Sequence, residues 1–486
     1  MLKDIIKKEI LDHLLSAKFI FMFIICSVLI LLSVYMGTAE YLEDKKVYDD
    51  DIAWDALAMQ PPNTYSILLE GALKVHRPPR LLGSLVKGVE DAAGRVSLTN
   101  KTEVSLSESK YENNPLTAVF GAFDLLFIVK MALSLFAILL IYDTICGEKE
   151  KGTLKLSLSN SVPRDRLLLG KVVGGYVSLC VPLIFPLMIS LIYLSLHPGI
   201  DFSGEDWQRV CLIFLMFLLY LTVFFCLGLL VSSLTARSAT SLIVLLFAWS
   251  IWGMVVPKAS VLIAGHLKPI PTANEIYTQK TMYSTQIGRE LTEIGLKRAQ
   301  DLAGQFNMRV TPTSSGGYSI STAENADIAG FQKAFSEMNQ ELNKERSDKV
   351  IENTAKLDRD YLMRKDAQAA LAKNISRISP ASALTFSATA LAGTGTDDYA
   401  RFWKAVMDYK PVITAWVNTE PSLRNERGAY KSIDSSTLVG MPRPAIEPEK
   451  LDRSVPRILP DLVSMVVMIV LLTGGAYFAF IRCDVR

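Results

Sequence analysis

Cysteine is scarce in this chain, and its distribution excludes a domain held together by disulfide bonds. The 486 residues include six cysteines, and none lies in residues 38–122 or 257–461. Small exported domains that lack a sufficient core are usually held together by disulfide bonds. These two long segments must therefore be stabilised by side-chain packing, and the second is long enough to bury a core of its own.

Motifs for catalysis and for nucleotide binding are also missing. No Gly-x-x-x-x-Gly-Lys-Ser/Thr occurs, so no loop of this type can wrap its backbone amides around phosphates. His-Glu-x-x-His, Cys-x-x-Cys and Gly-x-Ser-x-Gly are absent as well. The sequence therefore predicts that the chain is not an enzyme and binds no cofactor itself.

Nothing in the sequence favours a metal centre or a nucleic-acid partner. The histidines His13, His76, His197 and His266 are scattered along the chain. The last three could meet in space to hold a metal ion, but scattered surface histidines are the commoner explanation. The net charge is +2, and no basic patch with interleaved aromatic residues occurs. We predict neither kind of site.

Apolar sequence, in contrast, is abundant. Hydrophobic residues make up 50% of the chain and charged residues 21%, which is typical of a chain divided between lipid and water. A helix needs about 20 apolar residues to cross a bilayer. Stretches that meet or approach this length are residues 19–37, 123–142, 172–196, 210–234, 239–256 and 462–481. We therefore predict an α-helical polytopic membrane protein with six transmembrane helices.

The distribution of Lys and Arg predicts the orientation of these spans. Lysines precede the first span, and residues 143–171 carry six basic side chains between the second and third spans. The link between the third and fourth spans is acidic until Arg209. Both termini are therefore expected in the cytoplasm, with residues 482–486 as a tail. Residues 38–122 and 257–461 then become extracytoplasmic inserts.

Residues 1–18 are predicted to form an amphipathic helix that lies in the headgroup plane. Ile6, Ile10 and Leu14 recur at helical spacing, while the nearby lysines lie off that stripe and favour an anionic leaflet. A plain extension of the first span is the alternative. The first span itself is not expected to be a cleaved signal peptide, because no small-residue cleavage site follows it.

The two inserts are predicted to form one mainly helical α+β domain. Glu40–Met59 is an acidic run that can continue the first span as a helix, and Arg95–Leu106 has the alternation of short strands. Glu275–Ala303 and Ile328–Asn374 have helical patterns.

The helix at residues 328–374 has a coiled-coil-like seam formed by Ile328, Phe331, Phe335, Met338 and Leu342. Its register is lost beyond Glu345. Thr311–Gly317 is predicted to be a loop, and Pro442–Pro456 a proline-rich connector.

The charged segment 143–171 lies between the second and third spans. Residues Glu148 to Lys151 alternate in sign, and Gly152 and Thr153 break and restart the chain. A compact charged element between two membrane helices can receive a push from a soluble partner and convert it into helix motion. A loop that merely satisfies the charge rule is the alternative, and charge alone does not separate the two. Leu154–Leu158 alternates with a period of two, which indicates a strand.

The order of residues in this segment resembles the coupling loop of type-2 ABC (ABC-2) exporter permeases. It contains Asp143, Gly147–Leu154 (GEKEKGTL), Leu158-Ser159, Pro163-Arg164 and Gly170-Lys171. In such permeases the loop docks on an ATPase subunit. The resemblance assigns this contact to Asp143, Gly147, Glu148, Glu150, Gly152, Thr153, Arg164 and Lys171. The charged residues would form ion pairs with the ATPase, Gly152 would allow a bend, and Thr153 would cap the docking helix.

Three shorter motifs resemble a branch of these permeases with a large extracytoplasmic insert. They are Arg77-Pro78-Pro79, the pair Ile378–Ala381 and Tyr399–Trp403, and Asp484-Val485-Arg486. The resemblance implies the permease subunit of an ATP-driven exporter in the bacterial inner membrane. It further implies two copies of an ATPase subunit that bind ATP and Mg²⁺, and a second copy of the permease or a related one.

Two other functions stay open at this point. The chain could pass ATP-driven motion to its outer inserts, which would act on a periplasmic or surface partner without transport. It could also be a receptor or scaffold that needs no ATPase. No feature of the sequence identifies a substrate.

Two ionisable residues fall early in the second span. Asp124 and Lys130 are six positions apart, so they lie on different helix faces and are not expected to pair well. Such residues are costly in a membrane unless they pair, reach the interface or face water. We expect Asp124 to be interfacial. Lys130 either lines a pathway between two permease subunits or has a structural role, and the sequence favours neither.

Overall fold

The computed structural model describes residues 2–58, 73–99, 104–106, 121–155, 163–312, 318–322, 327–419, 442, 444 and 446–482. The chain forms two compact units. Unit 1 consists of Met1–Lys258 and Ser376–Arg486, and unit 2 of Ala259–Ile375. The two inserts therefore do not form a single domain as expected. Most of the second insert is a separate unit, and only its last part joins the first insert.

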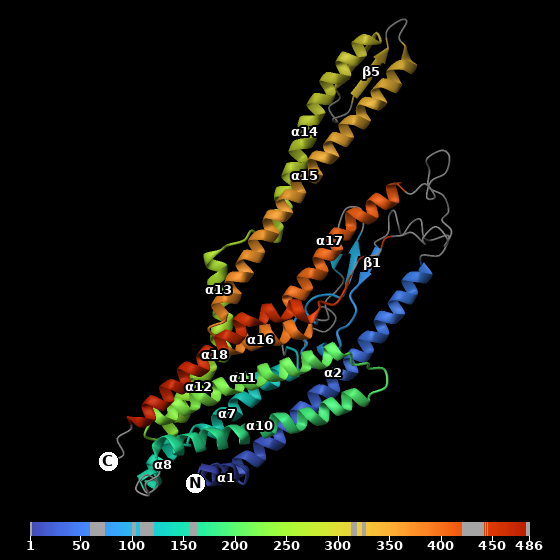
Figure 1. The fold of residues 1–486 in the computed structure, drawn as a ribbon. Coiled ribbons are helices and arrows are strands. Elements are labelled where there is room, and N and C mark those ends of the chain that lie inside the picture. The colour runs from blue at the N-terminus through green and yellow to red at the C-terminus, as the bar shows by residue number, and fades with distance from the viewer. Residues whose placement is uncertain are drawn as a thin grey trace. The chain divides into compact units, whose positions relative to one another are not determined.

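Six helices in the described part of the chain are long and apolar enough to cross a membrane, as predicted. They contain five of the six predicted spans, most of them continuing beyond the prediction, and the second span, predicted at residues 123–142, is helical over Leu125–Ile141 (Figure 1). Their elements are α2 (Ala17–Ala58), α6, η2 and α7 (Leu125–Ile128, Val129–Leu133, Ser134–Ile141), α10 (Arg164–Leu196), α11 (Gly204–Leu234), α12, η3 and α13 (Ser238–Ser250, Ile251–Val255, Val256–Leu267), and α18 (Leu451–Ile481). α2 extends to Ala58 because the acidic run after the first span is helical, as expected.

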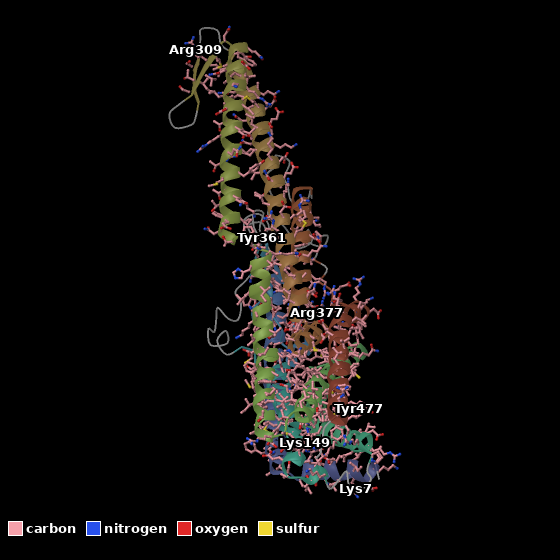
Figure 2. The ribbon with its side chains drawn as sticks, turned by 90° about the vertical axis from the view of Figure 1, so that its left-hand side faces the viewer. Lys7, Lys149, Arg309, Tyr361, Arg377 and Tyr477 are labelled. Atoms are coloured by element: carbon pink, nitrogen blue, oxygen red, sulfur yellow. The ribbon has the colours of Figure 1, made fainter. Side chains whose placement is uncertain are left out.

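Two ends of unit 1 can be defined by contacts between helix termini. At the first, Lys18 of α2 lies 2.9 Å from Asp143, which follows α7, and Arg164 of α10 donates to the carbonyl of Ile481 at 2.7 Å. We call it the α8 end, after α8 (Cys146–Glu150). At the α16 end, named after α16 (Pro380–Ala392), Leu451 N donates to Glu205 at 2.8 Å. Figure 2 places Lys7 and Lys149 at the α8 end, away from Arg377.

The core of unit 1 is packed around α11. Its buried side chains include the fully covered aromatic residues Tyr220 and Phe224. α11 lies against α7 so closely that a Cβ added at Gly228 would stand 1.9 Å from Cγ2 of Ile141. Only a glycine permits this approach. α11 also packs against α16 and α18, so it links both ends of the unit.

Two spans contain a turn of π-helix, in which one backbone carbonyl loses its regular helical partner. In η2, the carbonyl of Lys130 accepts hydrogen bonds from Ser134 Oγ at 2.5 Å and from Tyr220 OH at 2.8 Å. In η3, the carbonyl of Trp252 accepts one from Ser379 Oγ. Side chains from other helices therefore satisfy groups that lipid could not.

The prolines inside the spans show that one sequence prediction, the end of the connector at Pro456, is wrong. Pro182 and Pro186 lie within α10, as expected. Pro456 does not end the connector that was predicted to run from Pro442, because α18 already begins at Leu451 and contains Pro456 and Pro460. A proline removes one backbone hydrogen bond, and helices in a membrane tolerate this where neighbouring groups compensate.

The α16 end of unit 1 carries a small antiparallel sheet of order β1-β2-β3, formed by Leu73–His76, Val96–Thr99 and Val104–Leu106. The strands predicted in Arg95–Leu106 are therefore present. The sheet pairs Val75 with Ser97, and Leu98 with Ser105. α17 (Thr396–Thr419) lies beside it, and the short helix η1 (Leu81–Ser84) packs against α2 and α16. Arg77 donates to the carbonyl of Gly393 at 2.9 Å, which joins the two inserts.

Unit 2 is an antiparallel pair of helices, α14 (Ala273–Gln305) and α15 (Ile328–Ser376), joined through the hairpin β4–β5 (Met308–Pro312 and Tyr318–Thr322). Both helices were predicted, and Figure 2 shows Arg309 and Tyr361 far apart along this pair. Four residues of the predicted seam pack against α14 and β4, whereas Ile328 is 49% exposed. Thr311 and Pro312 lie in β4 rather than in a loop, because they pair with Ser319 and Tyr318. Residues 313–317 lie outside the described part.

Candidate functional site

α8 is held at one end by the last turn of α11 and at the other by the first residue of α12, on either side of the turn between these helices. Ser232 Oγ accepts hydrogen bonds from the amides of Ile145 at 3.1 Å and Cys146 at 3.2 Å, which satisfies the first donors of α8. At its other end, Glu150 accepts from the amide and hydroxyl of Ser238, at 3.1 and 2.8 Å, where α12 begins. A carboxylate at a helix N-terminus is favourable. α8 therefore cannot move without moving that turn.

Lys149 strengthens this attachment from the same side. Its ammonium donates to the carbonyl of Ser233 at 2.5 Å and to that of Thr235 at 3.3 Å. These carbonyls belong to the end of α11, where backbone acceptors lack helical partners and a cation is favoured. α8 and α12 are in contact at Gly147, where an added Cβ would lie 3.5 Å from Ser238 Oγ, an ordinary van der Waals distance.

Lys171 of α10 connects α8 to the N-terminal helix α1 (Leu2–Leu14). Its side chain is only 2% exposed, and its ammonium lies 2.9 Å from Glu9 and 2.7 Å from Glu148. A buried ammonium is stable only where carboxylates or other acceptors surround it. Lys171 is therefore the junction of three separate helices, each of which supplies one charged group.

α1 packs closely onto α10 beside this junction. A Cβ added at Gly170 would lie 2.5 Å from Cγ2 of Ile5, and one at Gly174 would lie 2.7 Å from Cβ of Glu9. The predicted amphipathic helix is therefore present, but its stripe is half-buried against protein. His13, on the same helix, has a buried Nε2 without a hydrogen-bond partner in the described chain. Burial lowers the pKa of His13.

The bend after α8 has the geometry that the sequence indicated. Gly152 has a φ of +74°, which a glycine adopts without strain. The hydroxyl of Thr153, which is itself helical, donates to the carbonyl of Glu148 at 3.4 Å near the end of α8, and its predicted role as the cap of the docking helix stays a prediction. Residues 153–155 are helical, so the strand predicted from Leu154 is wrong there, and residues 156–162 lie outside the described part.

We call this arrangement the platform. It comprises α1, α8, the α11–α12 turn and the first turns of α10. The structure brings together most of the predicted site residues here, but their contacts lie within the chain. Asp143 pairs with Lys18, Glu148 with Lys171, and Arg164 bonds to Ile481. The sequence patterns missed Glu9, Lys149 and Ser232. A signal for Glu9 was its place beside the apolar stripe of an otherwise lysine-rich helix.

The platform also has exposed polar and charged side chains that do not form the internal contacts described above. Lys151, Thr153 and Lys155 are exposed after α8, and Asp165 and Arg166 are exposed at the start of α10. Charged side chains of this kind are available for contact with a soluble surface. Leu154, between them, is buried and anchors the segment.

Asp124 and Lys130 lie far from the platform, at the opposite end of the second span. Asp124 is buried and caps α6 by accepting from the amides of Phe127 at 2.8 Å and Lys87 at 3.0 Å, so it has a structural role. Lys130 is half-buried in η2. Its ammonium forms no hydrogen bond with the residues that the structure describes, and its role stays a prediction.

Comparison with known proteins gives one result. The sequence profile of the ABC-2 family transporter proteins matches residues 4–485. No curated protein matches the chain. The match includes the platform, the six candidate spans and both predicted inserts, so it concerns the whole architecture and not one motif.

Proposed function

The chain belongs to the ABC-2 family of transporter proteins, and from this premise we propose that it is the permease subunit of an ATP-driven exporter. Members of this family are membrane subunits that associate with an ABC ATPase. The proposal adds that ATP hydrolysis in this partner moves the six spans, and that the platform receives the motion. Its main support is the position of Lys171, which joins α1, α8 and α10 in one buried contact.

The platform has the connections that such a receiver needs. A force on α8 reaches the second span through the turn at Asp143, the third span through Lys171, and the fourth and fifth spans through Ser232 and Ser238. Four of the six spans therefore respond to one short helix. We assign the charged contacts with the ATPase to the exposed side chains of this segment, which are the predicted Glu150 and Arg164 together with Lys151, Lys155 and Arg166.

The proposed complex contains two permease subunits, identical or related, and two ATPase subunits that bind ATP and Mg²⁺. The platform would face the cytoplasm of a bacterial cell, in agreement with the concentration of Lys and Arg near it. Because Lys18 and Ile481 both lie at the α8 end, the two termini would share that side. The β1-β2-β3 sheet and unit 2 would then be extracytoplasmic.

Purification of the tagged full chain from its native membranes tests this proposal. A P-loop ATPase should co-purify with the wild-type chain. Lys151→Glu should reduce its recovery several-fold, because reversal of an exposed interfacial charge weakens association. Lys344→Glu, an equally exposed change in unit 2, should leave recovery unchanged. Absence of any such ATPase from the wild-type preparation would refute the proposal.

A second candidate function, mechanical transmission without transport, is favoured by the continuity of α2. This single helix of 42 residues is about 60 Å long. Its first turn holds Lys18, paired with Asp143. Its second half carries Asp44, 2.6 Å from Arg95, and, near its end, Asp55, 2.6 Å from His76 of the sheet. A rigid helix fixed at both ends can carry motion from the platform to the sheet.

Spin labels at position 74, on the exposed β1 residue Lys74, would detect such motion in a complex of two permeases. Transmission predicts that their separation changes during ATP turnover. Met36→Pro should abolish the change, because a proline inside a helix kinks it. Met36→Ala at the same half-exposed position should preserve it. A separation that stays constant in the wild type during turnover excludes this function.

A further inference from the structure

A cavity of about 450 Å³ lies at the α16 end of unit 1. Its walls come from α2, the segment before η1, the N-terminus of α11, the ends of α16 and α17, and the connector that precedes α18. Apolar side chains such as Leu81, Leu82 and Ala392 form part of the lining, next to charged residues. The cavity belongs to neither the platform nor the proposed ATPase contact.

The carboxylates in the cavity wall are mostly bonded to other groups of the chain. Glu205 accepts from Arg209 at 2.8 Å, and Glu449 lies 3.0 Å from Arg457. Asp398 pairs with Arg401. Asp206 accepts from the hydroxyl of Ser203 at 2.7 Å. The three ion pairs neutralise Glu205, Glu449 and Asp398, whereas the hydroxyl leaves the charge of Asp206 in place, and Glu447 is an exposed acid at the rim.

Arg80 is the exception among the charged groups of the wall. Its guanidinium forms no hydrogen bond or ion pair with the residues that the structure describes, and its Nε is buried. The side chain lies beside Gly393, which has a φ of +72°, and a Cβ added there would be in ordinary contact with Arg80 Nε at 3.7 Å. Burial, and then the neighbouring Arg77, lower the pKa of Arg80. The structure thus holds a cation where a positive charge is disfavoured.

The charges in the wall limit the kind of anion that could pair with Arg80. The lining has three bases, Arg80, Arg209 and Lys450, against five acids, of which Asp398 and Glu449 are paired with Arg401 and Arg457 outside it and Glu205 with Arg209. Among the described residues, Glu447 and Asp206 are left without a basic partner and Arg80 and Lys450 without an acidic one, so the remaining charges suit a ligand that carries both signs. A phosphodiester carries one negative charge, and a linked ammonium group would be attracted by acids such as Glu447. A zwitterion therefore suits the cavity better than a free phosphate ion.

The cavity's place in the fold indicates where such a ligand comes from. Three membrane-spanning helices contribute to its wall: α2 through Tyr41, just past its apolar stretch, α11 through Arg209 near its start, and α18 through its N-cap Lys450. Helix ends that carry aromatic and basic side chains are typical of the lipid headgroup level. A lipid that packs beside these helices would bring its head group to the cavity.

We propose that this cavity binds a zwitterionic phospholipid head group, with Arg80 holding the phosphate. The guanidinium would donate two hydrogen bonds to the phosphate oxygens, the geometry that arginine forms with this group. The ammonium would lie toward Glu447 and Asp206. The inference rests on the spans crossing a bilayer and does not depend on coupling to an ATPase.

Native mass spectrometry of the full chain, purified in detergent and depleted of lipid, tests the proposal. Phosphatidylethanolamine should bind more tightly than phosphatidylglycerol, and glycerophosphoethanolamine and inorganic phosphate should bind weakly. Arg80→Gln should weaken phosphatidylethanolamine binding about tenfold or more, because a charge-assisted bond is lost. Arg80→Lys should retain part of the affinity. Arg453→Gln removes an exposed arginine of α18 outside the cavity and should have no effect.

Chemical modification of the wild-type chain provides a readout that does not require a variant to fold. Phenylglyoxal modifies accessible guanidinium groups, and added phosphatidylethanolamine should protect Arg80 but not Arg453. Unchanged lipid affinity in Arg80→Gln, or modification of Arg80 that lipid does not reduce, would overturn the proposal. Equal binding of glycerophosphoethanolamine and intact lipid would show a soluble ligand instead, and equal binding of phosphatidylglycerol would exclude the zwitterion.

Discussion

Replacement of Lys171 by methionine is the sharpest test of the platform. Methionine keeps most of the length and apolar surface of the side chain and removes only the charge. The ammonium now lies 2.9 Å from Glu9 and 2.7 Å from Glu148, and the residue is 2% exposed. Without it, two carboxylates that contacted the same nitrogen face each other, that of Glu9 buried and that of Glu148 partly buried.

The size of the effect follows from this burial. Removal of one partner from a buried ion pair costs about 3–5 kcal/mol, because the remaining charge loses its compensation. Lys171 has two partners, so we expect the upper part of that range for unfolding of the platform. Exposed ion pairs contribute only about 0–1 kcal/mol. The loss of stability measured for a variant therefore distinguishes a buried junction from an exposed surface ion pair.

Thermal unfolding of the purified chain in detergent measures this loss. Lys155→Met is the matched control, because Lys155 is exposed on the same segment, and it should stay within about 0.5 kcal/mol of the wild type. Adding Glu9→Gln and Glu148→Gln to Lys171→Met should restore much of the stability, since no buried charge then remains uncompensated. If Lys171→Met and Lys155→Met unfold alike, Lys171 is not the junction we describe.

Two further predictions concern packing and pH. Gly228→Ala should destabilise unit 1 by about 1–3 kcal/mol because its Cβ would overlap Ile141. The control Gly474→Ala should leave stability unchanged, because a Cβ there meets nothing within 4 Å. Equal unfolding temperatures of the two variants would contradict this prediction. The pKa of His13 is lowered by burial from 6.5, so the unfolded chain binds more protons, and stability should fall as the pH drops below about 6.5. Unfolding curves between about pH 7.5 and pH 5.5 should show a smaller loss for His13→Gln, and equal losses would refute the assignment.

Much of the fold could be predicted because its signals are local. The spans are continuous apolar runs, and α15 carries a seam whose spacing alone indicates a partner helix. The helical continuation of the first span was readable from the acidic run that ends near Ala58. The start of α18 could not be predicted from the sequence, because Pro456 suggested a break in the helix. A membrane helix can contain a proline whose lost hydrogen bond is compensated by neighbouring groups.

The contacts of the platform could not be predicted, because they join residues that are distant in sequence. Glu9 and Lys171 are separated by 162 positions, and Lys149 and Ser233 by 84. The motif identifies Glu148 and Lys171 as candidate site residues, but it does not show that they form an ion pair with each other. Alternating charges look like a solvated surface in sequence, and only the packing of α1 on α10 shows that part of this charge is internal.

This distinction decides how charge variants of the segment should be interpreted. Glu148→Lys would place a second cation beside Lys171, so any loss of coupling could come from a broken junction. Glu150→Lys would remove the carboxylate at the start of α12. Lys151→Glu alters neither contact, because that side chain points to solvent. A coupling defect in Lys151→Glu with unchanged unfolding therefore reports on the partner surface. The same defect in Glu148→Lys with lowered stability reports on how the platform holds its own helices.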